Sequence, residues 1–101
     1  MNFDDKEWDE EEIRIVCDVV TGITTIRGLI LKHERTYMYI KNRLDLMVKY
    51  NILSLEKIPK VRKNIYNSGI VTKEFLNKAK EHNNAINEEI DKILEILNEG
   101  V

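Results

Sequence analysis

Between Ile23 and Leu53 the apolar residues have the spacing expected for two helices joined by a polar turn. Apolar positions before the polar run 32–35 are followed by others that recur every three or four residues, the period of an amphipathic helix. The second helix is expected to end at Asn51, because asparagine tolerates the left-handed conformation often found just past a helix end. Two apolar residues then open a strand. This order predicts a helix-turn-helix that leads into a wing. The helical apolar positions are Ile26, Leu29, Ile30, Ile40, Leu44, Met47 and Val48.

An earlier helix is predicted between Asp9 and Gly22. Asp9 and Glu12 have the spacing of a capping box, in which each side chain accepts a hydrogen bond from the backbone amide of the other residue. One apolar face follows, and Cys17 on it is expected to be a small core residue rather than a reactive thiol. The residues of that face are Ile13, Val16, Cys17 and Val20.

The helix predicted over 36–50 carries the candidate DNA-reading side chains. Thr24 or Thr25 is expected to cap the shorter helix before it, and Thr36 to cap this one. A DNA major groove admits one helix, and its base edges are read by Arg, Lys, Asn and similar side chains. The alternative is an ordinary amphipathic helix with a polar solvent face. The candidate contacts are Arg35, Thr36, Tyr39, Lys41, Asn42 and Arg43.

After Leu53 the helical period is lost, and a two-stranded wing is predicted up to Val71. Ile65-Tyr66 and Ile70-Val71 provide strand-like pairs, and Asn67-Ser68-Gly69 between them leaves the register open. The tip of the wing is expected near Pro59–Asn64. Its cations are suited to contacts with DNA phosphates. They are Lys60, Arg62 and Lys63.

The C-terminal stretch predicts one long helix that begins after Thr72 and runs to about Asn98. Its apolar residues fall at alternating steps of three and four, which is the heptad pattern of a coiled coil, with Asn83 as the one polar position. At 1.5 Å per residue such a helix is about 40 Å long, which favours a partner helix from a second copy. The alternative is that this stripe packs on the chain's own first helix. The seam comprises Leu76, Ala79, Asn83, Ile86, Ile90, Ile93 and Leu97.

Charge divides the chain into three parts. Residues 1–12 hold seven acids and one lysine, and residues 81–101 hold six acids and one lysine. Residues 13–80 hold fourteen Lys or Arg residues against five acids. A basic middle between acidic ends is what a DNA-contacting module with non-contacting ends would show. The alternative is a solvated surface with chance clustering.

Composition predicts one small domain without enzymatic activity or a cofactor. No apolar run approaches the roughly 20 residues that span a bilayer, and the acidic start is unlike a signal peptide, so we expect a cytoplasmic protein. No phosphate loop or catalytic arrangement of side chains is recognisable. The candidate metal ligands Cys17, His33 and His82 lack the spacing of a metal site.

Leu29-Ile30 and the run from Ile40 to Leu53 resemble winged helix-turn-helix proteins of the MarR and PadR type. Thr72-Lys73-Glu74 is similar to the start of the helix that follows the wing in that family. The layout is closest to small archaeal chromatin-associated winged-helix proteins, in which a long C-terminal helix forms a coiled-coil dimer. Residues shared in type with those proteins are Tyr37, Ile40-Lys41, Leu44 and Lys49.

Together these patterns predict a mainly α fold with a small β-hairpin (α+β). A flexible acidic N-terminus (1–8) is expected to precede a winged helix-turn-helix domain (9–71) and a coiled-coil dimerisation helix (72–99). The expected function is that of a homodimeric protein that binds double-stranded DNA and regulates transcription. The alternative is a protein–protein interaction adaptor on the same scaffold that does not bind DNA.

Overall fold

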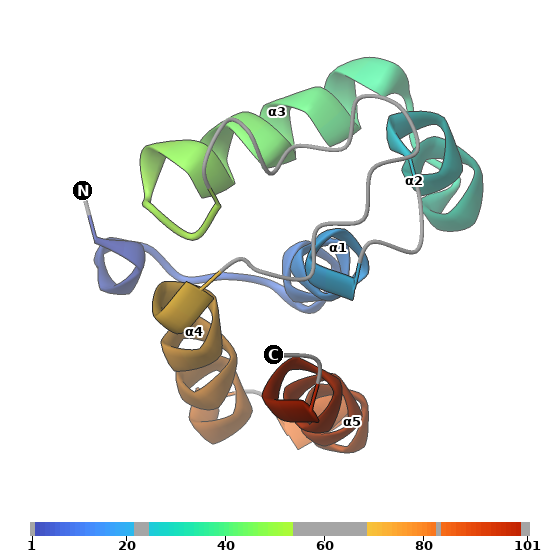
Figure 1. The fold of residues 1–101 in the computed structure, drawn as a ribbon. Coiled ribbons are helices and arrows are strands. Elements are labelled where there is room, and N and C mark those ends of the chain that lie inside the picture. Colours follow the sequence, from blue (N-terminus) through green and yellow to red (C-terminus); the bar gives the residue numbers. More distant parts are fainter. Residues whose placement is uncertain (1, 22–24, 54–68, 83, 100–101) are drawn as a thin grey trace.

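A computed structural model of the chain describes residues 2–21, 25–53, 69–82 and 84–99 (Figure 1). Within these ranges every regular element is a helix, either an α-helix or a short 3-10 turn. The elements in chain order are η1 (Phe3–Asp5), α1 (Glu10–Thr21), α2 (Ile26–His33), α3 (Tyr37–Lys49), α4 (Gly69–His82), η3 (Asn84–Ile86) and α5 (Asn87–Glu99).

Helix α1 lies at the centre of the molecule. In Figure 1 the pair α2–α3 lies above it and the pair α4–α5 below it. Nine of its twelve residues are buried, including Ile15 and Val19, which lie outside the apolar face predicted for this helix. A helix that is apolar on nearly all sides packs against neighbours on both sides. Thus α1 provides core surface to both helix pairs.

The sequence signals for helix ends hold in most places. The predicted capping box is confirmed, since the Asp9 amide donates to Glu12 Oε1 over 3.1 Å and the Glu12 amide donates to Asp9 Oδ1 over 2.7 Å. Thr25 and Thr36 cap α2 and α3, each accepting a hydrogen bond of 3.1 Å from a backbone amide three residues on. Asn51 has a φ of 64°, which confirms the left-handed residue predicted beyond α3.

The predicted α+β fold with a β-hairpin wing is wrong: the described residues contain no strand. Ile70 and Val71, expected in the second strand, lie in the first turn of α4. Thr72, expected as a cap, is inside that helix, where its buried hydroxyl donates to the carbonyl of Ile52 over 2.9 Å. The predicted tip at Pro59–Asn64 lies outside the described residues.

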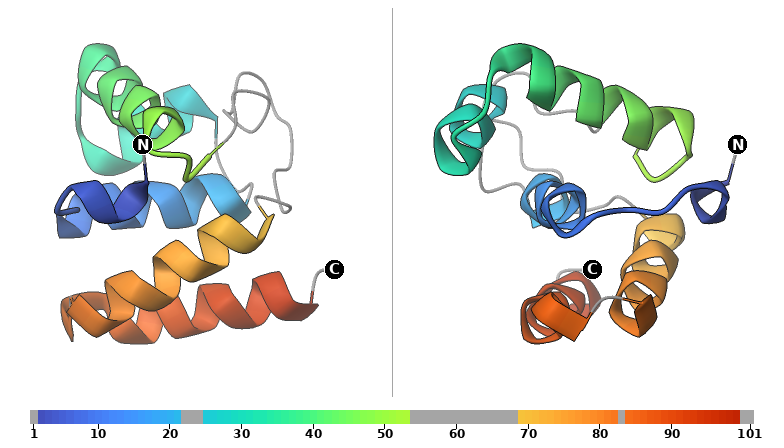
Figure 2. Two further views of the ribbon diagram at one scale, coloured as in Figure 1. Left: turned by 90° about the vertical axis from the view of Figure 1, so that its left-hand side faces the viewer. Right: turned by 180° about the vertical axis from the view of Figure 1, so that it is seen from behind.

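The prediction of a single long C-terminal helix is also wrong, because α4 ends at His82 and α5 begins at Asn87. The two helices lie side by side and run in opposite directions (Figure 2). The molecule measures only 30 × 29 × 25 Å, too short for the 40 Å helix. The apolar stripe packs instead on the chain's own α1, as the alternative interpretation expected. Ion pairs from Glu89 to Arg14 (2.6 Å) and from Asp91 to Lys80 (2.5 Å) hold α5 on α1 and α4.

Candidate nucleic-acid interface

Helices α2 and α3 form a helix-turn-helix with a three-residue connection, Glu34–Thr36. Glu34 adopts the left-handed conformation with a φ of 53°, and its amide donates to the carbonyl of Ile30. The Arg35 amide donates to the same carbonyl over 3.2 Å. This is the end typical of a helix that turns sharply. Connections of this length between two crossing helices are found in DNA-binding helix-turn-helix units.

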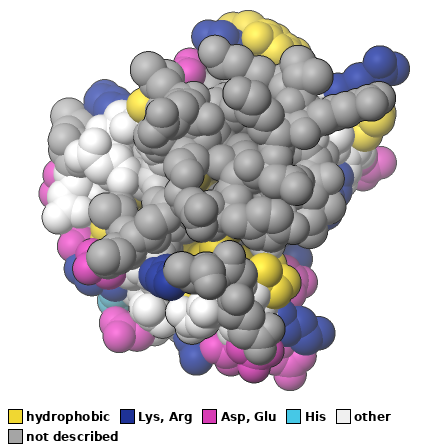
Figure 3. Space-filling view, in the orientation of Figure 1, with side chains coloured by type: hydrophobic (Ala, Val, Ile, Leu, Met, Phe, Trp, Pro, Cys, Tyr) yellow, Lys and Arg dark blue, Asp and Glu magenta, His cyan; other side chains and the backbone are white. Residues whose placement is uncertain are grey.

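One side of α3 faces solvent while the other is buried. The buried side is formed by Ile40, Leu44 and Met47. Predicted contacts Lys41 and Asn42 are exposed, and Lys41 lies 3.5 Å from Asp45 in an exposed ion pair. At the upper edge of Figure 3, over α3, hydrophobic side chains lie beside Lys or Arg side chains. The exposed residues of α3 are Tyr37, Met38, Lys41, Asn42, Asp45 and Lys49.

Three other predicted contacts are turned toward the first turn of α1. Arg35 donates through Nε and Nη2 to the two carboxylate oxygens of Glu11, over 2.9 and 2.8 Å. The hydroxyl of Tyr39 donates to Glu11 Oε1 over 2.7 Å. Arg43 Nε lies 3.9 Å from Glu12 Oε2 and has no hydrogen-bond partner in the described part of the chain. Thus Tyr39 and Arg43 of α3, and the exposed Arg35 that precedes it, contact the first turn of α1.

The ring of Tyr39 connects the two arginines. The guanidinium carbons of Arg35 and Arg43 each lie 4.6 Å from its centroid, within the range of a cation–π contact. The hydrogen bonds from Arg35 are the main reason that the pKa of Glu11 lies below its ordinary value, although burial opposes the shift. Burial and the bond to Glu11 raise the pKa of Tyr39. We call Glu11, Arg35, Tyr39 and Arg43 the α1–α3 cluster.

A second polar contact joins α2 to α1. Asp18 is buried in α1, and its carboxylate lies 2.8 Å from His33 Nε2 and accepts a 2.6 Å hydrogen bond from Lys32 Nζ. Sequence reasoning missed Asp18. The available signal was that Asp18 is the one acid within the apolar run 15–20. Its partners, Lys32 and His33, lie at the end of the next helix. His33, the last residue of α2, therefore has a structural contact with α1.

The remaining residues predicted to contact DNA or to form the dimer seam do not belong to the α1–α3 cluster. Thr36 is the exposed cap of α3. Lys60, Arg62, Lys63 and Asn83 lie outside the described residues. Ile93 is half-buried, and the other predicted seam residues are buried within their own chain. These buried residues are Leu76, Ala79, Ile86, Ile90 and Leu97.

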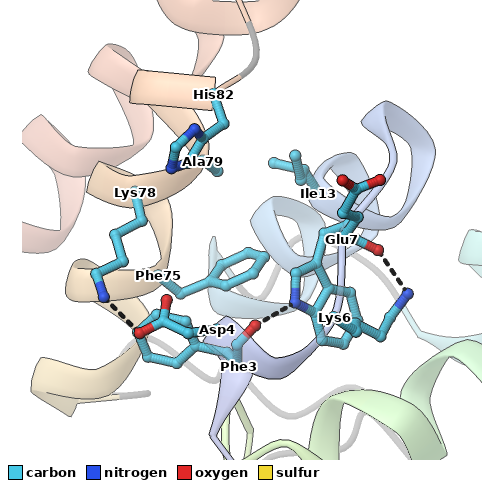
Figure 4. Close-up of a pocket in the computed structure, with 10 residues that line it drawn as sticks. Phe3, Asp4, Lys6, Glu7, Ile13, Phe75, Lys78, Ala79 and His82 are labelled. Atoms are coloured by element: carbon cyan, nitrogen blue, oxygen red, sulfur yellow. Dashed lines mark hydrogen bonds and ion pairs between the residues drawn. The ribbon is translucent and has the colours of Figure 1, made fainter.

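A cavity of about 510 Å³ lies between the N-terminal segment and α4. In Figure 4 Phe3 and Phe75 lie beside each other, with ring centroids 5.6 Å apart, next to the ion pair of Asp4 and Lys78. Asp4 and Lys78 of the lining pair with each other, and Lys6 of the lining lies 3.2 Å from Glu12 Oε1. The cavity does not include any residue of the α1–α3 cluster.

The described ranges contain no group of three or more His, Cys, Asp or Glu residues placed to hold a metal ion. None of the helices in those ranges is both long enough and apolar enough to cross a membrane.

No protein-family model, curated protein or solved structure matches the chain.

Proposed function

We propose that the protein binds double-stranded DNA through α2 and α3, with the exposed side of α3 in the major groove. The observation that carries this proposal is the α2–turn–α3 unit, whose second helix is packed on one side and leaves Lys41 and Asn42 exposed on the other. Arginine, lysine and asparagine are the side chains that read base edges. At 13 residues, α3 is about 20 Å long, which suits one pass along a groove.

Charge supports the same surface. Residues 26–50 hold six Lys or Arg residues against two acids, whereas α5 holds five acids and one lysine. Phosphate contacts provide most of the non-specific affinity of a DNA-binding protein, so a basic face is required. The helix pair α2–α3 meets that requirement and the pair α4–α5 does not.

The test is a titration of the protein into fluorescent random duplex DNA at low salt. Wild-type protein is expected to bind at micromolar concentration, the range of non-specific affinities. The double variant Lys41→Ala with Asn42→Ala is expected to bind about tenfold more weakly. It loses the contact of Lys41 with a phosphate or a base and the contact of Asn42 with a base. The control is Lys92→Ala with Asn98→Ala on the exposed side of α5, which removes the same residue types and is expected to change affinity less than about twofold.

A second candidate function is protein binding by the same helix pair. Its specific support is the exposure of three large apolar side chains near the turn, Leu31 (69%), Tyr37 (52%) and Met38 (60%). Apolar side chains of this size on a surface are typical of a contact with another protein. Absence of any DNA binding at micromolar protein would overturn the first proposal and favour this one.

A further inference from the structure

The carboxylate of Glu11 is held in the way that a phosphate group is held. It accepts two parallel hydrogen bonds from the Arg35 guanidinium and one from the Tyr39 hydroxyl. A guanidinium binds a carboxylate and a phosphate with the same two-pronged geometry, because both present a pair of anionic oxygens. The partners of Glu11 therefore form a recognition site for an oxyanion, and in the unliganded protein that oxyanion is supplied by the chain itself.

The position of these partners is one at which DNA backbone contacts are expected. Arg35 directly precedes Thr36, the cap of α3, and its side chain is 48% exposed. Side chains around the start of a recognition helix, together with the positive end of its dipole, commonly contact phosphates. Arg43, one helical turn beyond Tyr39, adds a second guanidinium against the same ring and has an Nε without a hydrogen-bond partner in the described structure.

The internal ion pair is accessible from solvent. Glu11 is 24% exposed and Arg35 is 48% exposed, so solvent screens part of their attraction and a phosphate can reach the guanidinium. A phosphate brings the same oxygens and more negative charge. A phosphate therefore competes with the carboxylate of Glu11 for the same guanidinium.

We propose that Arg35, Tyr39 and Arg43 form a phosphate-binding site for the DNA backbone, and that the carboxylate of Glu11 competes with the phosphate for it and keeps Arg35 largely occupied in the wild-type protein. This inference rests on the proposed DNA-binding function and adds a means of regulation to it. The first turn of α1 acts as an internal competitor that lowers affinity for all DNA sequences alike, because a phosphate contact carries no base information.

The experiment compares Glu11→Gln with Glu10→Gln in the duplex DNA titration. Both variants remove one negative charge from the same turn of α1, but Glu10 pairs with Arg14 of its own helix, whereas Glu11 pairs with Arg35. Glu11→Gln is expected to raise affinity about fivefold and to steepen the salt dependence by about 0.9, the slope of one additional phosphate contact. Glu10→Gln is expected to change affinity less than about twofold. Equal effects of the two variants, or weaker binding by Glu11→Gln, would overturn the proposal.

Glu11→Asp provides a variant with unchanged net charge. Its shorter side chain draws the carboxylate away from Arg35, so affinity is expected to rise although the charge is that of wild type. Unchanged affinity of a folded Glu11→Asp protein counts against the proposal.

Arg35→Ala completes the cycle. In wild type it is expected to change affinity less than about twofold, because Glu11 already occupies the guanidinium, whereas in the Glu11→Gln background it should abolish the gain. Equal losses in both backgrounds would show that Glu11 does not block Arg35.

If neither wild type nor Glu11→Gln binds DNA, the proposed function itself fails. If wild type binds and Glu11→Gln gains nothing, only the present inference fails.

Discussion

The thiol of Cys17 lies in the middle of α1 and is 7% exposed. Burial and the neighbouring carboxylate of Asp18 raise its pKa to about 12. The nucleophile in thiol chemistry is the thiolate, which is therefore scarce at pH 8 in the folded protein. We expect an aromatic disulfide reagent at pH 8 to react with native protein only as fast as the protein unfolds. In denaturant the reaction should be complete within seconds to minutes, and rapid reaction of native protein would contradict the burial of Cys17.

Glu11 gives a pH dependence of known sign. Because its pKa in the folded protein lies below the ordinary value of 4.5, the ion pair with Arg35 stabilises the fold above the unfolded pKa. That contribution is lost as pH falls through the lower, folded pKa. We expect the difference in urea midpoint between wild type and Glu11→Gln to be constant from pH 8 to about pH 5 and to shrink at lower pH. If the difference in urea midpoint grew as the pH was lowered, the pKa of Glu11 in the folded protein would be raised instead of lowered.

At the residue scale, sequence reasoning found the candidate contacts but not their partners. Lys41 and Asn42 are exposed as predicted, because their positions opposite the apolar stripe of α3 follow from the helical period. The period gives no information on which helix lies next to a given side chain. The pairing of Glu11 with Arg35, 24 residues apart, depends on how α1 packs against α3 and could not be read from spacing.

At the scale of the helices, a buried hydrogen bond joins α4 to the segment that follows α3, and mutation can test it. Thr72 donates from α4 to the carbonyl of Ile52, whereas Thr21, equally buried, donates to carbonyls of its own helix, those of Cys17 and Asp18. Thr72→Val is expected to lower the free energy of unfolding by about 1–2 kcal/mol, because a buried acceptor loses its donor.

Thr21→Val is the matched control for this change. Its loss should be smaller than about 0.5 kcal/mol, since bonding by a threonine to its own helix contributes little and can be slightly unfavourable. Urea denaturation of the two variants measures both values. Equal losses would mean that the bond from the Thr72 hydroxyl to the carbonyl of Ile52 contributes little to stability.

The elements themselves were predictable wherever local chemistry decides them. Caps at Asp9 and Thr36 and the left-handed Asn51 depend on a few adjacent residues. The strand expected at Ile70-Val71 was wrong because β-branched residues favour strands only when a neighbouring strand is present. The heptad pattern does not distinguish packing against a second copy of the chain from packing against α1 and α4, because both arrangements bury the same apolar positions.

On the scale of the whole molecule, the location of that stripe can be tested without further structures. Ile90 is fully buried within its own chain, so Ile90→Ala is expected to cost about 2–5 kcal/mol of stability. The unfolding midpoint of wild type and variant should not depend on protein concentration. A midpoint that rises with concentration would indicate that folding is coupled to association of chains. The homodimer stays a prediction that light scattering can check separately.

The central position of α1 has a consequence for how the two ends of the molecule communicate. It lies between the pair α2–α3 and the pair α4–α5, and its buried residues belong to the one core cluster to which both pairs contribute. Local opening on one side would leave apolar groups of α1 in water, and the molecule should therefore open as one cooperative unit. Contact with a ligand at α3 would then slow amide hydrogen exchange in α5, on the far side of the molecule and without any contact between the two.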